Sequence, residues 1–322
     1  MTSRGGLERW SRAILAGAIA VAAVGGVLVG LSTSGVVRTD QVTPAGATAP
    51  STTTPAPAPA TTSAPAAPVA PAGPNACVVN ADLAAAVADA SHAGERAAAV
   101  LLDTATGAYF AAGEADAPFD TASVVKVFLA TELLLTDRMT GPTAGTAYTM
   151  ITRSDDDAAN ALYGRAGGDQ VVTLLGEHYG IADLGAPPAA PGKWGETTIT
   201  ADGLAHFYAA VEADPVVWPW LSNAMGHAAR AGSDGTDQYF GIPSAATDWA
   251  VKQGWMTGLG PGATYNSTGY VDHGRYVVVL LTHGPSARYG APMASTLTTM
   301  ARDVLPGGRP AGPGPDPAGC PG

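Results

Sequence analysis

Strand-like segments lie at both ends of the central part of this chain, and helix-like segments lie between them. Residues 97–103 and 108–112 are apolar runs on either side of the turn sequence TATG, which predicts an antiparallel hairpin. Further strand-like runs occur much later, at residues 248–256, 263–271 and 275–283. Strands from both ends bury their apolar faces most simply in one antiparallel sheet. The order of elements therefore predicts an α+β fold rather than alternating βαβ units.

The helix-like segments fall into two groups. A helix capped by Asn80 precedes the hairpin, and residues 293–305 form one after the last strand, so these terminal helices are expected to flank the sheet. The remaining segments are expected to form a second, all-helical lobe. They are residues 123–138, 155–168 (ended by Gly167 and Gly168), 217–230, and two runs capped by Asp169 and Thr200. A cleft between the sheet and this lobe would be a natural active site.

The ends of the chain cannot join this folded core. Residues 13–36 carry no charge and follow three arginines, which predicts a cytoplasmic N-terminus at 1–12 and a transmembrane anchor or signal segment. Residues 37–75 are a Pro/Ala/Thr-rich linker, and residues 306–322 are expected to form a disordered tail. The folded domain is thus predicted at 76–305. We expect it outside the cytoplasm on a single-pass anchor, or secreted if the segment is cleaved.

Composition excludes several classes of function. The net charge is −11 and no basic run occurs beyond the N-terminus, which argues against nucleic-acid binding. The six histidines are scattered, and neither an HExxH nor a CxxC motif is present, so no metal and no cofactor are predicted. The two cysteines, Cys77 and Cys320, stand at opposite ends of the domain. They either pair outside the cytoplasm or remain unpaired thiols.

Ser123 and Lys126 form the first candidate for chemistry. At i and i+3 they share a helix face, and the apolar residues around Lys126 would desolvate its amine and lower its pKa. The chain has thirteen arginines but only three lysines, Lys126, Lys193 and Lys252. A lysine in such a chain hints at a role that requires a neutral amine, because arginine cannot lose its proton in a protein. The simpler alternative is a helix cap followed by a lysine that reaches solvent.

Two more motifs follow in order. Ser154-Asp155-Asp156 opens a helix, and Lys252-Gln253-Gly254 lies in a strand-like run. The order S-x-x-K, S-D-N, K-T-G is the signature of penicillin-recognising serine enzymes. The chain therefore resembles the serine β-lactamase and penicillin-binding protein superfamily, especially the class A β-lactamases, from about Asp82 to Val304.

The resemblance implies a role for each matched residue. Ser123 would attack a carbonyl, Lys126 would take or relay its proton, and Ser154 would pass a proton to the leaving nitrogen. Lys252 would add positive charge near Ser154 and a substrate carboxylate. The backbone N–H groups of Ser123 and Trp255 would form an oxyanion hole.

The remaining matched positions, Asp156, Gln253 and Gly254, would contact substrate, and two of them depart from the family pattern. Asp156 replaces an asparagine, so it either pairs with Lys126 and holds it charged or simply caps its helix. Gln253 replaces a small hydroxyl residue. The loop that would carry a deacylating glutamate offers only Glu196, which we interpret as an exposed loop residue rather than a water-activating base. Trp255 either fills part of the cleft or belongs to its wall.

These observations predict a membrane-anchored serine hydrolase. It would form an acyl-enzyme at Ser123 with D-alanyl peptides derived from peptidoglycan or with β-lactams, with weak turnover because no deacylating base is evident. The alternative is a catalytically impaired domain that binds cell-wall peptide or a partner protein, as the residues Asp156 and Gln253 would suggest.

Overall fold

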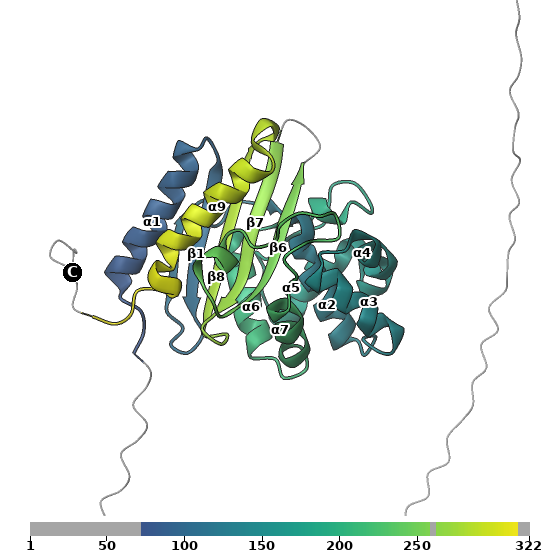
Figure 1. Ribbon diagram of the computed structural model, residues 1–322. Helices are drawn as coiled ribbons and strands as arrows, with labels where there is room; N and C mark the ends of the chain where they lie inside the picture. Colours follow the sequence, from purple (N-terminus) through teal and green to yellow (C-terminus); the bar gives the residue numbers. More distant parts are fainter. Residues whose placement is uncertain (1–71, 258–261, 315–322) are drawn as a thin grey trace, which may run out of the picture. The chain divides into compact units, whose positions relative to one another are not determined.

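The computed structural model describes residues 72–257 and 262–314 (Figure 1). Within these ranges no helix is both long and apolar enough to cross a bilayer. The predicted anchor at 13–36, residues 37–71 of the linker predicted at 37–75, and the last part of the predicted tail, 315–322, lie outside the described residues.

A five-stranded antiparallel sheet joins the two ends of the domain, as the order of elements predicted. Its strand order is β2-β1-β8-β7-β6. The strands are β1 (Arg96–Asp103), β2 (Tyr109–Gly113), β6 (Trp249–Thr257), β7 (Gly262–Val271) and β8 (Tyr276–Pro285). β1 from the early hairpin pairs with β8 over its whole length. The two edges of the sheet are therefore β2 and β6.

Both faces of the sheet are covered. The terminal helices α1 (Ala76–His92) and α9 (Ala291–Val304) pack on each other and on one face (Figure 1). Helix α6 (Ala201–Glu212) contacts β1 and β8 from the other side. Alternate residues of β1 enter different cores, since Leu101 joins the cluster with α1 and α9 whereas Val100 joins the cluster with α6. The predicted α+β fold, with an antiparallel sheet flanked by helices, is confirmed.

The remaining long helices form the expected helical part beside β6 (Figure 1), but the helix capped by Thr200, which was predicted for this lobe, is α6 and packs on the sheet instead. They are α2 (Val125–Leu135), α3 (Pro142–Thr152), α4 (Asp156–Tyr163), α5 (Val171–Tyr179) and α7 (Trp218–Gly226). Helix α3 is absent from the sequence prediction. Its stretch is rich in Thr, Ala and Gly, which form a weak helical pattern, and only Pro142 at its first position is a start signal.

Several short elements complete the described residues, and none of them was predicted. A small sheet contains β3 (Phe119–Asp120), β5 (Thr198–Ile199) and β4 (Gly185–Ala186), and α8 (Ile242–Ala245) is a single helical turn. Elements of two to four residues carry no period that sequence analysis could detect. The small sheet matters for the site, because β3 leads directly into the segment that contains Ser123.

Two of the three predicted helix caps were wrong. Helix α1 begins four residues before Asn80, and its cap is Asn75, whose side chain accepts a hydrogen bond from the Val78 amide at 3.0 Å. Asp169 does not cap α5; its carboxylate instead accepts a hydrogen bond from the Gly192 amide. Thr200 caps α6 as predicted, accepting from the Gly203 amide at 2.9 Å.

The predicted disordered tail begins too early. The Asn75 amide donates to the carbonyl of Ala311 at 3.1 Å, and the Asn75 side chain donates to the carbonyl of Gly314 at 3.0 Å. Residues 306–314 are therefore held against the start of α1. Cys77, the second residue of the same helix, is disulfide-bonded, and the chain's other cysteine, Cys320, lies outside the described residues.

A buried ion pair secures the end of the sheet where β1 and β8 meet. The Asp103 side chain is fully buried, and Arg275 donates to its two oxygens at 3.2 and 3.0 Å. These hydrogen bonds keep the pKa of Asp103 below its usual value although burial acts in the opposite direction.

We expect Arg275→Ala to lower the free energy of unfolding by about 3 kcal/mol, because it leaves a buried carboxylate without its partner. Urea denaturation followed by circular dichroism measures this change. Arg302→Ala, at an exposed position on α9, is the control and should change stability by about 0.5 kcal/mol or less. Equal stabilities of the two variants would contradict the prediction.

Candidate active site

Ser123 lies in a tight turn between the small sheet and the helical part. β3 ends at Asp120, a 3₁₀ turn spans Ala122–Val124, and α2 begins at Val125. Ala122 has φ +46°, a left-handed conformation that costs energy for a residue with a side chain. The surrounding structure holds it there, since the Asn266 side chain donates to the carbonyls of Asp120 and Thr121 at 2.9 and 3.2 Å.

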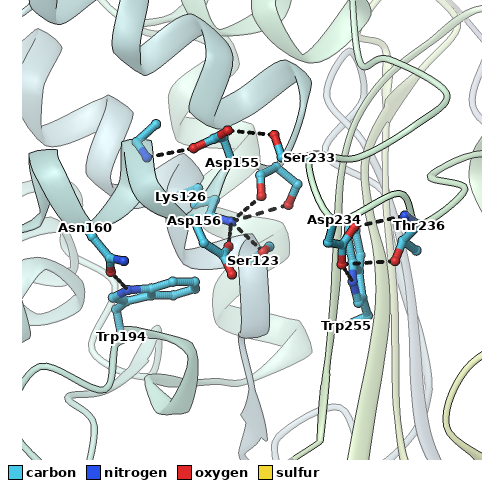
Figure 2. Close-up of polar contacts among 12 residues, drawn as sticks. Ser123, Lys126, Asp155, Asp156, Asn160, Trp194, Ser233, Asp234, Thr236 and Trp255 are labelled. Atoms are coloured by element: carbon cyan, nitrogen blue, oxygen red, sulfur yellow. Dashed lines mark hydrogen bonds and ion pairs between the residues drawn. The ribbon is translucent and has the colours of Figure 1, made fainter.

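Lys126 is completely buried one helical turn after Ser123, and its amine is the centre of the site (Figure 2). The Lys126 Nζ atom donates to Ser123 Oγ at 2.7 Å, to the Ser154 carbonyl at 2.8 Å and to Asp156 Oδ1 at 2.6 Å. Ser154 Oγ is a longer fourth neighbour at 3.4 Å. Burial lowers the pKa of Lys126, and the contact with Asp156 opposes that shift.

Ser154 links this amine to the second lysine. It lies between α3 and α4 with φ +53°, and the next residue, Asp155, caps α4 by accepting from the Ala158 amide at 2.8 Å. Lys252 on β6 donates to Ser154 Oγ at 2.9 Å and to the Gln253 carbonyl at 2.8 Å. Burial lowers the pKa of Lys252 well below its usual value, and the nearby Lys126 lowers it further.

The structure thus brings Ser123, Lys126, Ser154 and Lys252 into one hydrogen-bonded cluster from three distant stretches of sequence. Ser123 and Ser154 reach the surface in a cleft of about 670 Å³, and Trp255 forms part of its wall. Ser123 and Trp255 both line this cleft, and the oxyanion hole at their backbone N–H groups stays a prediction. The catalytic roles remain predictions, because the geometry shows proximity rather than reaction.

The cleft is strongly acidic. Five carboxylate residues line it, and Lys193 is the one basic residue among its described lining residues. The acidic residues are Asp155, Asp156, Asp157, Glu196 and Asp234. Asp234 accepts from the Trp255 indole at 2.9 Å, and this bond and those from Thr236 keep its pKa low against the effect of burial (Figure 2). These carboxylates oppose an anionic ligand, and the exposed Lys193 is the described lining residue whose charge would attract one.

Two predicted substrate-contacting residues do not line the cleft. The Gln253 side chain is buried and donates to the carbonyls of Gln238 and Phe240 at 3.2 and 2.6 Å, so it secures a neighbouring loop. Gly254 faces the turn that carries Ser123, and a Cβ atom built on it would lie 2.6 Å from the Thr121 carbonyl oxygen. Both predictions rested on the motif alone, which does not determine whether a residue of this edge strand faces the cleft or the protein interior. Asp156, by contrast, does line the cleft.

Trp194 is a cleft residue beside the lysine cluster that sequence analysis did not select. Its ring centre lies 4.9 Å from Lys126 Nζ, and its indole N–H donates to Asn160 Oδ1 at 2.9 Å (Figure 2). Glu196, two residues later, is half-buried in the cleft wall, and the described contacts include no bond from it to Ser123 or Lys126. The sequence signal that could have found Trp194 is an aromatic residue two positions before Glu196, in the loop that the resemblance places near Ser123.

Comparisons with known proteins agree with the fold and identify relatives. No family model matches the chain. It is 32% identical over 234 residues to proteins named "Putative lipoprotein LppW" from Mycobacterium tuberculosis and Mycobacterium bovis, covering 69% of this chain and 73% of theirs.

Among solved structures, a β-lactamase from Desulfarculus baarsii is similar with a TM-score of 0.54 and 20% identity, over 73% of this chain and 98% of that one. A class A β-lactamase representative from Bacteroides cellulosilyticus has a TM-score of 0.57 and 14% identity, over 71% and 98% of the two chains. At these identities the similarity establishes the β-lactamase fold alone.

Gly254→Ala should lower the free energy of unfolding by about 2 kcal/mol, because the added methyl group forces β6 away from the turn that carries Ser123. Thermal and urea unfolding would measure the change. Gly145→Ala is the matched control: it lies in α3 with no atom within 4 Å of an added Cβ, and should be neutral or stabilising by up to about 1 kcal/mol. Wild-type stability in Gly254→Ala would refute the assigned close approach.

Proposed function

We propose that this chain, which belongs to the family of the mycobacterial LppW proteins, is an extracytoplasmic serine hydrolase that forms an acyl-enzyme at Ser123. The substrates would be D-alanyl peptides of the cell wall or β-lactams. The observation that carries the proposal is the continuous cluster Ser123–Lys126–Ser154–Lys252 at the edge of an acidic cleft in a β-lactamase fold.

The proposed reaction begins with attack of Ser123 Oγ on the substrate carbonyl carbon. The Oγ–C bond forms while the Ser123 proton enters the cluster of lysines and Ser154, and the negative oxygen is stabilised by the Ser123 and Trp255 N–H groups. The C–N bond then breaks as Ser154 delivers a proton to the leaving nitrogen. The product of this half-reaction is an ester on Ser123 and a free amine.

A location outside the cytoplasm is supported by two observations. Cys77 is disulfide-bonded, and disulfides persist mainly in oxidising compartments. The LppW relatives are named as lipoproteins, a class held at membranes. The Cys77 thiol is occupied and cannot itself carry a lipid, so we propose that residues 13–36 hold this chain at the membrane.

Slow hydrolysis of the acyl-enzyme is part of the proposal. Deacylation needs a water molecule next to the ester and a base to activate it. The Trp194 ring covers Lys126 on one side, and Glu196 has no bond to the cluster among the described contacts. An aromatic surface excludes water from the place where such a base would have to act.

A second candidate function is favoured by one contact. The ion pair between Asp156 and Lys126 at 2.6 Å stabilises the charged form of the amine, which cannot accept a proton. A domain in which this pair blocked acylation would bind cell-wall peptide or a partner protein in the cleft without reacting.

Incubation of the full-length chain with a fluorescent penicillin distinguishes these two functions. We expect a stable adduct that mass spectrometry assigns to Ser123 and that disappears in Ser123→Ala. Ser222→Ala, on α7 and outside the cleft lining, is the control and should keep the label. If a folded chain remains unlabelled at high penicillin concentration, the enzyme proposal fails and the binding function is supported.

Trp194→Ala should shorten the lifetime of the Ser123 adduct at least tenfold, because water gains access to the ester beside Lys126. The decay of adduct fluorescence after removal of free penicillin measures this rate. Trp220→Ala, which removes an indole from α7 outside the cleft lining, should leave it unchanged. Identical decay in Trp194→Ala and the wild type would show that the ring does not limit deacylation.

A further inference from the structure

We propose that Asp156 sets opposite charges on the two active-site lysines, so that Lys126 is the ammonium ion and Lys252 is the neutral amine that receives the Ser123 proton through Ser154. The charge assignment stands on the geometry of the cluster. Its catalytic half deepens the acyl-enzyme function and rests on that proposal.

The hydrogen bonds of Lys126 match a protonated amine. An ammonium group has three N–H donors and no acceptor site. Lys126 has three short partners, each of which can accept: Ser123 Oγ, the Ser154 carbonyl and a carboxylate oxygen of Asp156, at 2.6 to 2.8 Å. One of them carries a full negative charge, which compensates for the loss of solvent around a completely buried amine.

Lys252 has fewer partners, and none of them is charged. Among the described residues its amine has two hydrogen-bond partners, Ser154 Oγ at 2.9 Å and the Gln253 carbonyl at 2.8 Å, and it also lies 5.9 Å from the centre of the uncharged Trp255 ring. A neutral amine satisfies both groups: it donates one N–H to the carbonyl and accepts the Ser154 hydroxyl proton on its lone pair. An ammonium group would leave one N–H without a partner in a side chain that is 1% exposed.

The charged groups around Lys252 favour the same assignment. The cation of Lys126 stands on the other side of Ser154 and disfavours a second positive charge, whereas Asp156 and Asp234 attract one from farther away. Burial is the largest influence, and it lowers the pKa of Lys252 much more than Asp156 and Asp234 raise it. For Lys126, Asp156 opposes the effect of burial by direct contact.

The proton path follows from these charges. As Ser123 Oγ bonds to the substrate carbon, Lys126 passes one of its protons to Ser154 Oγ, 3.4 Å away, and takes the Ser123 proton in exchange, while the Ser154 proton passes to the lone pair of Lys252. Lys252 becomes an ammonium ion, and Lys126 ends the step with three protons as it began. The reverse transfer from Lys252 through Ser154 then protonates the leaving nitrogen. Asp156 acts through Lys126 and is a positioning residue.

Nuclear magnetic resonance of the lysine side chains tests the charges directly. The chain contains three lysines, so the full-length protein labelled with [¹³C,¹⁵N]lysine gives three side-chain signals, and Lys193→Arg identifies the exposed one. We expect the Lys252 signal to titrate at lower pH than the Lys126 signal. Asp156→Asn should bring the two closer or reverse them, because Lys126 loses its anion and no longer repels charge from Lys252.

Kinetics test the catalytic half. Lys252→Arg keeps the positive charge but cannot supply a neutral amine, so it should slow labelling of Ser123 by fluorescent penicillin at least 100-fold. In an Asp156→Asn background Lys126 can become the base. Lys252→Arg in that background should therefore slow the labelling of Ser123 at least tenfold less than it does in the wild type. Asp237→Asn, which breaks an exposed ion pair with Arg230 outside the cleft lining, is the matched control background. It should leave the effect of Lys252→Arg on the labelling rate unchanged.

The outcomes separate the two proposals. If Lys126 titrates below Lys252 in the wild type, the charge assignment is overturned, whatever the activity. If the assignment holds but Lys252→Arg labels at the wild-type rate, the proton path is overturned and acyl-enzyme formation stands. If wild-type Ser123 never reacts, the proposed function and the path fall together, while the titration still decides the charges.

Discussion

The burial of two lysine side chains at one junction is the constraint on which this site depends. A buried amine is costly unless polar groups replace the water it has lost. Lys126 belongs to the helical part and Lys252 to the edge strand of the sheet, and Ser154, between two helices, bonds to both. The hydrogen bonds of the candidate site therefore also connect the sheet to the helical part.

Sequence order and local pattern predicted the sheet because each strand is long and apolar enough to show its period. The three motifs also identified the side chains that converge, since S-x-x-K on a helix fixes two of them in space. The position of Trp194 could not be predicted in this way. Its contact with Lys126 depends on how a loop folds over a turn 70 residues earlier, and a single sequence carries no signal for such long-range placement.

Gln253 shows why a motif match is weaker than a geometric one. By sequence it replaces a small hydroxyl residue in a substrate-binding strand. In the fold, its amide donates to two carbonyls of the loop at 238–240 and faces away from the cleft. The Gln253 side chain therefore supports this loop and does not line the cleft. The chain shares its fold with an ancestral class A β-lactamase at 21% identity, so most side chains at matched positions differ.

The two described ends of the domain meet at one corner, where Asn75 bonds to Ala311 and Gly314. This corner belongs to α1, which packs on β1 and β2, whereas Ser123 and Lys252 lie at the opposite edge of the sheet beside β6 (Figure 1). A mechanical pull transmitted along the chain from either side would be borne by α1, α9 and the strands beneath them. Such a load would reach the edge strand that carries Lys252 only across the rest of the sheet.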